Sequence, residues 1–229
     1  MLAIDVMTPA VVTATPDTTI PELCRLMLQS RISALPVLDS AGKIVGIITE
    51  GDLLRRVESG TDKKRAAWVE LFVSNSQLAA EYVKAHGRRA KDIMSTHIVA
   101  VNESTPLREI ADLFERHSIK RVPVVRENRL VGMVSRANLL QALVAMIEAK
   151  GEPAAPKDDA AIRAVLVKEF SDKSWRPSNV IVRQGIAHLW GEITSDEERA
   201  AMRVAAENTP GVKGVKDHTN YPVVWPPFA

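Results

Sequence analysis

The stretch GIITEGDLL at residues 46–54 returns with changed letters as GMVSRANLL at residues 132–140. The similarity extends outward on both sides, so that residues 6–57 align with residues 93–143. The identical pairs include Met7 with Met94, Thr18 with Thr105, Glu22 with Glu109, and Pro36-Val37 with Pro123-Val124. A match of this length is explained by an internal duplication and not by a chance motif.

Each copy predicts the same order of elements, strand, helix, hairpin and helix. The two first strands are expected at 11–13 and 98–101, and each leads into a helix. The first helix opens with Thr19-x-x-Glu22, the pattern of a capping box, and the second with Thr105-Pro106, which puts proline at the first helical position. The hairpin strands are expected at 34–38 and 44–49 in the first copy, and at 122–125 and 130–135 in the second. The last helices begin at 51–54 and 137–140.

A β-α-β-β-α unit of this kind leaves one sheet face open to solvent. Two tandem copies bury these faces most simply against each other about a pseudo-twofold axis. The fold class predicted for this part is therefore α/β (α+β). We place the first repeat at 1–57, a helical insert at 58–91 and the second repeat at 92–147.

The insert between the copies is longer than a simple connection and has helical spacing of its apolar residues. Trp68, Phe72 and Tyr82 are its large aromatic side chains. Two interpretations stay open: these side chains pack back onto the duplicated unit, or they form a dimerisation or partner surface.

A third unit follows a Pro- and Ala-rich linker at 148–156 and occupies residues 157–221, ahead of a Pro-rich tail at 222–229. Its pattern predicts the order αββαβ. The expected elements are a helix at 161–170, strands at 179–183 and 186–193, a helix opened by the capping box Ser195-x-x-Glu198, and a last strand at 212–219.

Composition excludes several classes of function. The 229 residues carry 30 Lys and Arg against 28 Asp and Glu, interspersed along the chain, so nucleic acid is not an expected partner. The single cysteine, Cys24, has no intramolecular disulfide partner, which fits a reducing compartment. No leader-like segment and no 18-residue apolar run is present, and we expect a cytoplasmic protein without a membrane span.

The repeated stretch places side chains that can bind a ligand at the point where a strand meets a helix. Thr49 or Ser135 ends the strand, and Asp52 or Asn138 follows near the helix start. A hydroxyl and free N–H groups favour a phosphate there, and a carboxylate accepts hydrogen bonds from ribose hydroxyls. The alternative is that these side chains only cap the helix.

No catalytic or metal-binding pattern is visible in the sequence. Nothing resembles a nucleophile paired with a base, so an enzyme is not expected. The histidines lack the spacing of metal ligands, so no metal site is predicted. They are His86, His97, His117, His188 and His218.

The duplicated residues resemble a pair of CBS domains over about residues 1–147. The resemblance rests on Met-Thr-Pro and Met-Ser-Thr near the start of each copy, Ser-Ala-Leu-Pro-Val and Lys-Arg-Val-Pro-Val in the middle, and Gly-hydrophobic-hydrophobic-Thr/Ser-x-x-Asp/Asn at the end. It implies an adenine nucleotide (AMP, ADP or ATP) bound in the clefts between the repeats, whose occupancy regulates an attached or partner protein.

The same resemblance implies which residues contact the nucleotide. Those expected to line the adenine and sugar pocket, largely through backbone groups, are Ile32, Ser33, Ala34, Ile119, Lys120 and Arg121, with Lys120, Arg121 and Arg136 directed at phosphate oxygens. The acidic Glu50 and the neutral Asn138 depart from the pattern. We therefore expect the two sites to differ, with one of them weak or empty.

The third unit resembles a BON domain. The residues that carry this resemblance are Gly185, Leu189, Gly191, Glu198-Arg199 and Pro210-Gly211-Val212. It implies lipid or membrane contact, against which the lack of an export signal argues here. The glycines are interpreted as turn and close-packing positions.

Together these patterns predict a cytoplasmic bacterial regulatory protein for signal transduction. The CBS pair would sense an adenine nucleotide, and the BON domain would transmit or localise the signal. The expected partners besides the nucleotide are a second copy of the chain in a homodimer and an effector protein. The alternative is a protein- or lipid-interaction scaffold with vestigial clefts.

Overall fold

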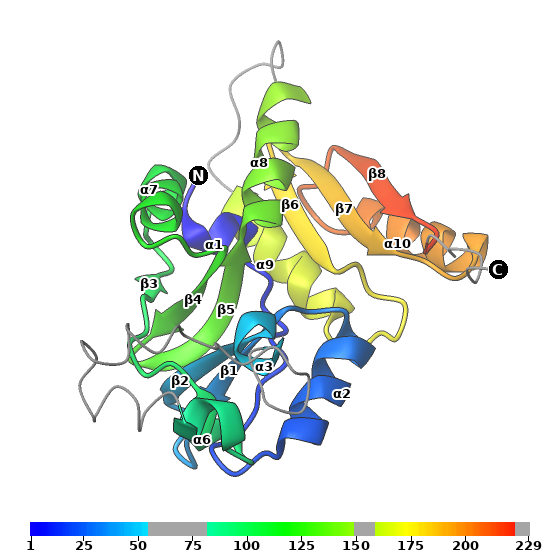
Figure 1. Ribbon diagram of the computed structural model, residues 1–229. Helices are drawn as coiled ribbons and strands as arrows, with labels where there is room; N and C mark the ends of the chain where they lie inside the picture. Colours follow the sequence, from blue (N-terminus) through cyan, green and yellow to red (C-terminus); the bar gives the residue numbers. More distant parts are fainter. Residues whose placement is uncertain (55–81, 149–158, 223–229) are drawn as a thin grey trace, which may run out of the picture. The chain divides into compact units, whose positions relative to one another are not determined.

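A computed structural model describes residues 1–54, 82–148 and 159–222 (Figure 1). The chain forms two compact units. Unit 1 comprises Met1–Ala10, Val101–Val124 and Val131–Ala229, and unit 2 comprises Val11–Ala100 and Val125–Leu130. The N-terminal segment therefore belongs with the second copy of the duplication, and the segment that leads into the second copy belongs with the first.

Unit 2 is built around the hairpin of the first copy. Strands β1 (Ala34–Leu38) and β2 (Ile44–Thr49) pair antiparallel, as predicted, and α2 (Ile20–Ser30), α3 (Glu50–Leu54) and α6 (Ala90–Ile93) accompany them. Leu23 and Met27 lie one helical turn apart, so α2 buries one face. The buried core consists of Ala14, Leu23, Met27, Leu35, Val37, Ile48, Ala90 and Ile93.

The start of α2 confirms the predicted capping box. The backbone N–H and the hydroxyl of Thr19 both donate to Glu22 Oε2, at 2.8 and 2.7 Å. These hydrogen bonds lower the pKa of the Glu22 carboxyl, the side-chain bond contributing most. The predicted first strand at 11–13 is wrong, because only a single parallel bridge between Ala14 and Val37 forms there.

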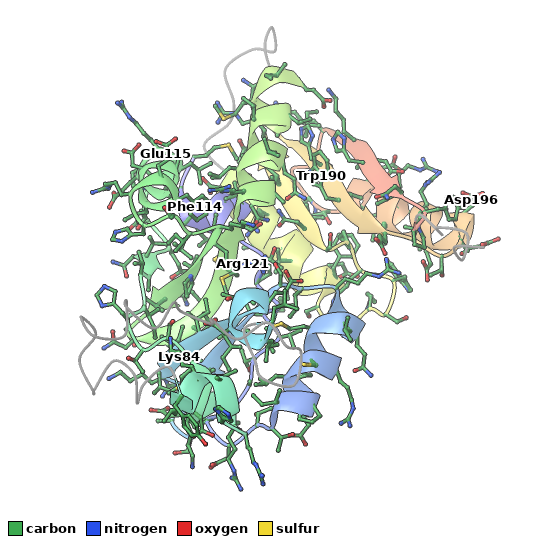
Figure 2. The ribbon with its side chains drawn as sticks, viewed as in Figure 1. Lys84, Phe114, Glu115, Arg121, Trp190 and Asp196 are labelled. Carbon is green, nitrogen blue, oxygen red and sulfur yellow. The ribbon has the colours of Figure 1, made fainter. Side chains whose placement is uncertain are left out.

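The second copy lies mostly in unit 1 and has the predicted order of strand, helix, hairpin and helix. The first strand, expected at 98–101, is corrected to two residues, because 98–100 do not join a sheet. Its elements are α1 (Ala3–Val6), β3 (Val101–Asn102), α7 (Leu107–Arg116), β4 (Arg121–Arg126), β5 (Arg129–Ser135) and α8 (Arg136–Glu148), with sheet order β3-β4-β5. Pro106 is the residue before α7 and not its first helical residue, which corrects the expectation. On this helix Phe114 is buried and Glu115 is exposed (Figure 2).

The C-terminal module, also in unit 1, has the predicted order αββαβ. Its elements are α9 (Asp159–Phe170), β6 (Asn179–Arg183), β7 (Ile186–Glu192), α10 (Asp196–Glu207) and β8 (Gly214–Asn220). Strand β7 pairs antiparallel with β6 and parallel with β8. The core of the module includes Ile162, Leu166, Phe170, Val180, Val182, Ala187, Leu189, Ile193, Met202 and Ala206. Because side chains alternate along a strand, Asn179, Ile181 and His188 point to the sheet face opposite this core.

That opposite face meets the second copy through α1 and α8, both of which contact β6. Arg163 on α9 donates to the carbonyl oxygens of Met7 (2.6 Å) and Val180 (2.7 Å). Asn179 Nδ2 donates to Val6 O at 3.0 Å and to Gln141 Oε1 at 2.7 Å. Arg163 is buried, and desolvation lowers its pKa to about 10. The module is therefore joined to the second copy by buried polar contacts.

Each hairpin contains a glycine against which a methionine packs, and that methionine comes from the segment that begins the other copy. Gly132 on β5 faces Met7, and Gly46 on β2 faces Met94. A Cβ atom at Gly132 would lie 2.5 Å from Met7 Sδ and 2.9 Å from its Cγ. The repeated Met and Gly positions thus form one packing contact at each hairpin, where the absence of a glycine side chain leaves room for a methionine.

We expect Gly132→Ala to lower the free energy of unfolding by about 1–3 kcal/mol, because the added methyl group overpacks against Met7. Denaturant unfolding measures the loss. Gly51→Ala is the matched control, since its new Cβ would make only an ordinary contact, at 3.6 Å from Thr49 Oγ1. Combining Gly132→Ala with Met7→Ala should cost less than the sum of the two single changes, and strict additivity would contradict the packing assignment.

Candidate functional site

In the first repeat, the corner between β2 and α3 brings Thr49 and Asp52 together. The backbone N–H and the hydroxyl of Thr49 donate to Asp52 Oδ2, at 2.9 and 2.7 Å. The loop before β1 lies at the same corner, because the N–H of Glu50 donates to Ser33 O at 3.1 Å. Ile32 and Ser33 are half-buried, as are Thr49 and Asp52, and Ala34 is buried.

The second repeat builds the same corner between β5 and α8. The N–H and the hydroxyl of Ser135 donate to Asn138 Oδ1, both at 2.8 Å. The N–H of Arg136 donates to Lys120 O at 3.1 Å, which is the counterpart of the Glu50–Ser33 bond. Ile119 and Arg121 are half-buried, while Lys120 and Arg136 are exposed. In each repeat a backbone hydrogen bond therefore joins the loop before the first hairpin strand to the strand–helix corner.

The helix-cap interpretation accounts for only part of the first corner. One oxygen of Asp52 takes both hydrogen bonds from Thr49, which fixes the carboxylate relative to the strand end. Among the described residues, Oδ1 of Asp52 makes no hydrogen bond. A carboxylate that is oriented through one oxygen, and whose other oxygen makes no hydrogen bond to the described residues, is suited to accept hydrogen bonds from a ligand's hydroxyl groups.

The second corner differs, because Asn138 is 5% exposed and its polar groups bond within the protein. Its Oδ1 accepts both bonds from Ser135, and its Nδ2 lies 3.3 Å from Gln141 Oε1 and 3.4 Å from Thr8 Oγ1. Gln141 Oε1 also accepts from Asn179 of the C-terminal module. A chain of amides thus runs from the predicted second site to β6.

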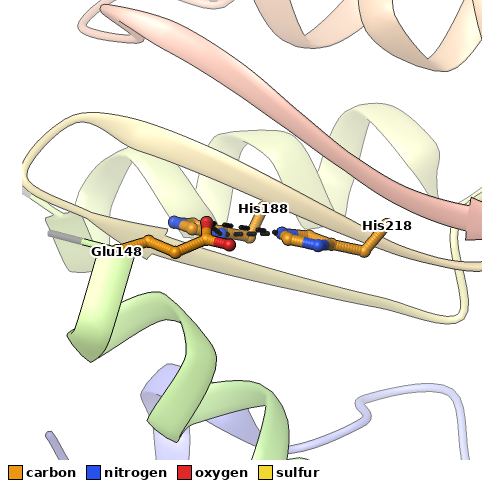
Figure 3. A group of neighbouring side chains, drawn as sticks. All are labelled: Glu148, His188 and His218. Carbon is orange, nitrogen blue, oxygen red and sulfur yellow. Dashed lines mark hydrogen bonds and ion pairs between the residues drawn. The ribbon is translucent and has the colours of Figure 1, made fainter.

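One cluster was missed by the sequence reasoning. The structure brings His188 on β7, His218 on β8 and Glu148 at the end of α8 together (Figure 3). Spacing along the chain carries no signal for it. The parallel register of β7 and β8 sets His188 opposite Lys216 and Trp190 opposite His218, and only this pairing brings the two histidines close.

Several sequence interpretations concern the insert and other surfaces. Trp68 and Phe72 lie outside the described residues, while Tyr82 is 65% exposed and stacks on His86 with ring centroids 3.9 Å apart.

A depression near the start of α2 contains none of the predicted site residues; it is lined by Thr15, Asp17, Thr18, Glu22, Arg25, Leu26 and Gln29. None of the described helices is long and apolar enough to cross a membrane.

Comparison with protein families matches both parts of the chain. The CBS domain model matches residues 3–59 and 90–145, and the BON domain model matches residues 158–222. The CBS domain-containing protein YhcV of Bacillus subtilis is 30% identical over 136 residues, which span 59% of this chain and 80% of YhcV. Uncharacterized protein MJ1426 of Methanocaldococcus jannaschii is 28% identical over 155 residues, spanning 63% of this chain and 92% of that protein.

Among solved structures, the crystal structure of CBSX2 in complex with AMP is similar to this chain with a TM-score of 0.56 and 26% identity. The match covers 64% of this chain and 98% of CBSX2, a protein of Arabidopsis thaliana. The fold class predicted from the sequence is confirmed by these matches together with the strand order of each part. The chain therefore belongs to the CBS domain-containing proteins, with a tandem CBS pair followed by a C-terminal BON domain.

Proposed function

We propose that this chain is a regulatory protein that binds an adenine nucleotide at the strand–helix corner of its first CBS repeat. The observation that carries the proposal is the geometry of Asp52, whose carboxylate is held by Thr49 and keeps one oxygen for a ligand. The AMP in the similar CBSX2 structure supports the choice of ligand class. AMP, ADP and ATP share the ribose that this carboxylate would contact.

The second repeat has a different role in this proposal. The side-chain oxygen of Asn138 accepts from Ser135, and its Nδ2 donates to Gln141 and Thr8, so little acceptor capacity remains for a ribose. The same network leads through Gln141 to Asn179 of the BON domain. The second repeat therefore serves as the platform on which the BON domain docks, and the BON domain is the output module.

Regulation then follows from a shift in population. Nucleotide binding favours one arrangement of the CBS pair, and a ligand shifts an equilibrium only by its difference in affinity for the two states. The docked BON domain experiences that shift through α1 and α8, which contact β6. Its own partner is an effector protein, and neither catalytic chemistry nor a nucleic-acid partner is part of this proposal.

The test is thermal unfolding of the full chain with AMP, ADP and ATP added one at a time. Binding at a nucleotide concentration about 100 times Kd should stabilise the folded state by roughly 2.7 kcal/mol, a shift of several degrees. No shift with any of the three nucleotides would contradict the proposal and favour an interaction scaffold whose clefts are vestigial.

Asp52→Asn is expected to weaken nucleotide binding about tenfold or more. An asparagine here would turn its Oδ1 toward Thr49, as Asn138 does toward Ser135, and would present donors where the ribose needs an acceptor. Charge-assisted hydrogen bonds contribute roughly 1.5–3 kcal/mol, against about 1 kcal/mol for neutral ones. Calorimetric titration with AMP and 2′-deoxy-AMP measures the effect.

Asp39→Asn is the matched control in the same repeat. Asp39 Oδ1 accepts from the backbone N–H groups of Ala41 and Lys43, both at 2.9 Å, in the turn of the β1–β2 hairpin. This change should leave nucleotide affinity unaltered. Equal binding of AMP and its deoxy analogue by the unsubstituted protein would remove Asp52 from ribose recognition and leave it as a helix cap.

A further inference from the structure

Three side chains from distant parts of the sequence converge at the junction of the second CBS repeat and the BON domain. Glu148 is the last residue of α8, His188 lies on β7 and His218 on β8 (Figure 3). His188 Nδ1 is 3.0 Å from His218 Nε2. Glu148 Oε2 is 3.7 Å from His188 Nδ1 and 3.9 Å from His218 Nε2. All three potential ligand atoms therefore face one small volume.

This spacing fits a tetrahedral metal ion. Zn²⁺ binds imidazole nitrogen and carboxylate oxygen at about 2.0–2.2 Å, so two ligand atoms at the tetrahedral angle lie roughly 3.3–3.5 Å apart. The three observed separations bracket that value, and movements of well under 1 Å would equalise them. Three protein ligands leave the fourth position to water or to a group from a partner.

Burial of the cluster disfavours the charged form of both imidazoles. His188 is only 1% exposed, and burial lowers its pKa to about 4; burial also lowers the pKa of His218. The neighbouring Lys216 lowers the pKa of the Glu148 carboxyl. In the metal-free protein the hydrogen bond between His188 Nδ1 and His218 Nε2 needs a proton on one of these two nitrogen atoms, so binding of an ion moves that proton to the far nitrogen of the same ring.

Two neighbours shape the site further. The Trp190 ring stacks on His218 with centroids 4.0 Å apart and planes 9° apart, which restricts rotation of that imidazole. Lys216 Nζ lies 3.2 Å from Glu148 Oε2 and competes with an ion for the carboxylate. The Lys216 side chain is 45% exposed, so solvent is accessible to it when an ion takes its place.

We propose that Glu148, His188 and His218 form a binding site for a divalent transition-metal ion of the Zn²⁺ class. Imidazole and carboxylate ligands favour zinc and its first-row neighbours over magnesium and calcium, which prefer oxygen ligands alone. The ion joins the end of α8 to the BON sheet. Metal binding is then a second input to the BON domain, separate from the nucleotide site in the first repeat.

The test is calorimetric titration of the full chain, stripped with a chelator, with ZnCl₂ at neutral pH. We expect one ion bound per chain. His218→Gln and Glu148→Gln should each weaken binding by at least about tenfold. His117→Gln is the matched control, because His117 is exposed at the C-cap of α7 and is not one of the three clustered side chains. Lys216→Gln should bind zinc at least as tightly as the unsubstituted protein.

A second readout uses the stacked tryptophan. Binding of Co²⁺ should produce visible absorption bands typical of tetrahedral coordination and should quench tryptophan fluorescence, and Trp190→Phe should retain the bands while losing most of the quenching. His188 is buried, so its substitution would disturb folding. The variants therefore change His218 and Glu148 instead, and thermal unfolding without metal checks that each variant protein is folded.

Failure of zinc to bind, or unchanged zinc affinity in folded His218→Gln, would overturn the proposal. Asp52→Asn should leave zinc binding unaltered, since that residue lies in the other compact unit. The metal site and the nucleotide site can therefore fail independently.

Discussion

Replacing Leu166 with alanine is expected to unfold the BON domain while the CBS pair stays folded. Leu166 on α9 is fully buried in the core of the module, among Ile162, Phe170 and Leu189. Truncating a buried leucine to alanine costs about 2–5 kcal/mol. A core of this size rarely supplies more than about 3–5 kcal/mol, so one such change removes most of the stability of the module.

The loss is visible in near-UV circular dichroism, since Trp175 packs edge-on against Phe170 with centroids 6.2 Å apart and loses this fixed surrounding. Leu28→Ala is the matched control, because Leu28 on α2 is 78% exposed and a change there should stay within about 0.5 kcal/mol. Retained nucleotide binding in Leu166→Ala would show that the sensor folds without its output module. A single unfolding transition shared by both parts would contradict that separation.

Arg163→Met is expected to destabilise the docking of the BON domain on the second CBS repeat by about 2–4 kcal/mol. The guanidinium donates to Val180 O within the module and to Met7 O of the segment after α1. Hydrogen bonds of a charged donor contribute roughly 1.5–3 kcal/mol each, and their removal leaves two carbonyl oxygens without this donor. Relief of the desolvation that lowers the pKa of Arg163 offsets part of the loss.

Hydrogen exchange in α1 and thermal unfolding measure the effect, and a loss of this size should lower Tm by roughly 4–16 °C in a chain of this length. Arg203→Met is the matched control in the same domain. Arg203 is exposed, and its one ion pair within the described residues is with Glu207, one turn away on α10, at 3.3 Å, so its loss should cost under about 0.5 kcal/mol. Equal effects of the two substitutions would show that Arg163 does not hold the domains together.

Local patterns in the sequence were enough to predict the elements with short-range determinants. The hairpin β1–β2 has the predicted bounds, and Gly42 with φ of +77° makes the turn that its position indicated. The capping box at Thr19 and the order αββαβ of the BON domain were predicted for the same reason. The strand expected at 11–13 was wrong because a strand needs a partner along its length, and only Ala14 finds one.

The candidate nucleotide site was predicted in part. The repeated Thr/Ser-x-x-Asp/Asn pattern led to Thr49 with Asp52 and Ser135 with Asn138, and each pair is hydrogen-bonded. That the two corners differ was predicted from Asn138. The use of that asparagine in a buried network with Gln141 and Asn179 was not, because these residues come from elements whose contact depends on docking of the BON domain.

By itself the sequence determined the duplication, the helix caps, the hairpins and the order of the three modules, because these depend on backbone preferences and side-chain periodicity over a few neighbouring residues. Only the tertiary structure decided that Met7 packs on Gly132, that Arg163 bonds to Met7 O, and that His188 meets His218 and Glu148. These contacts join residues 30 to 156 positions apart. They form only when whole elements pack in one register, since no local pattern encodes the distance between two side chains on different strands or helices.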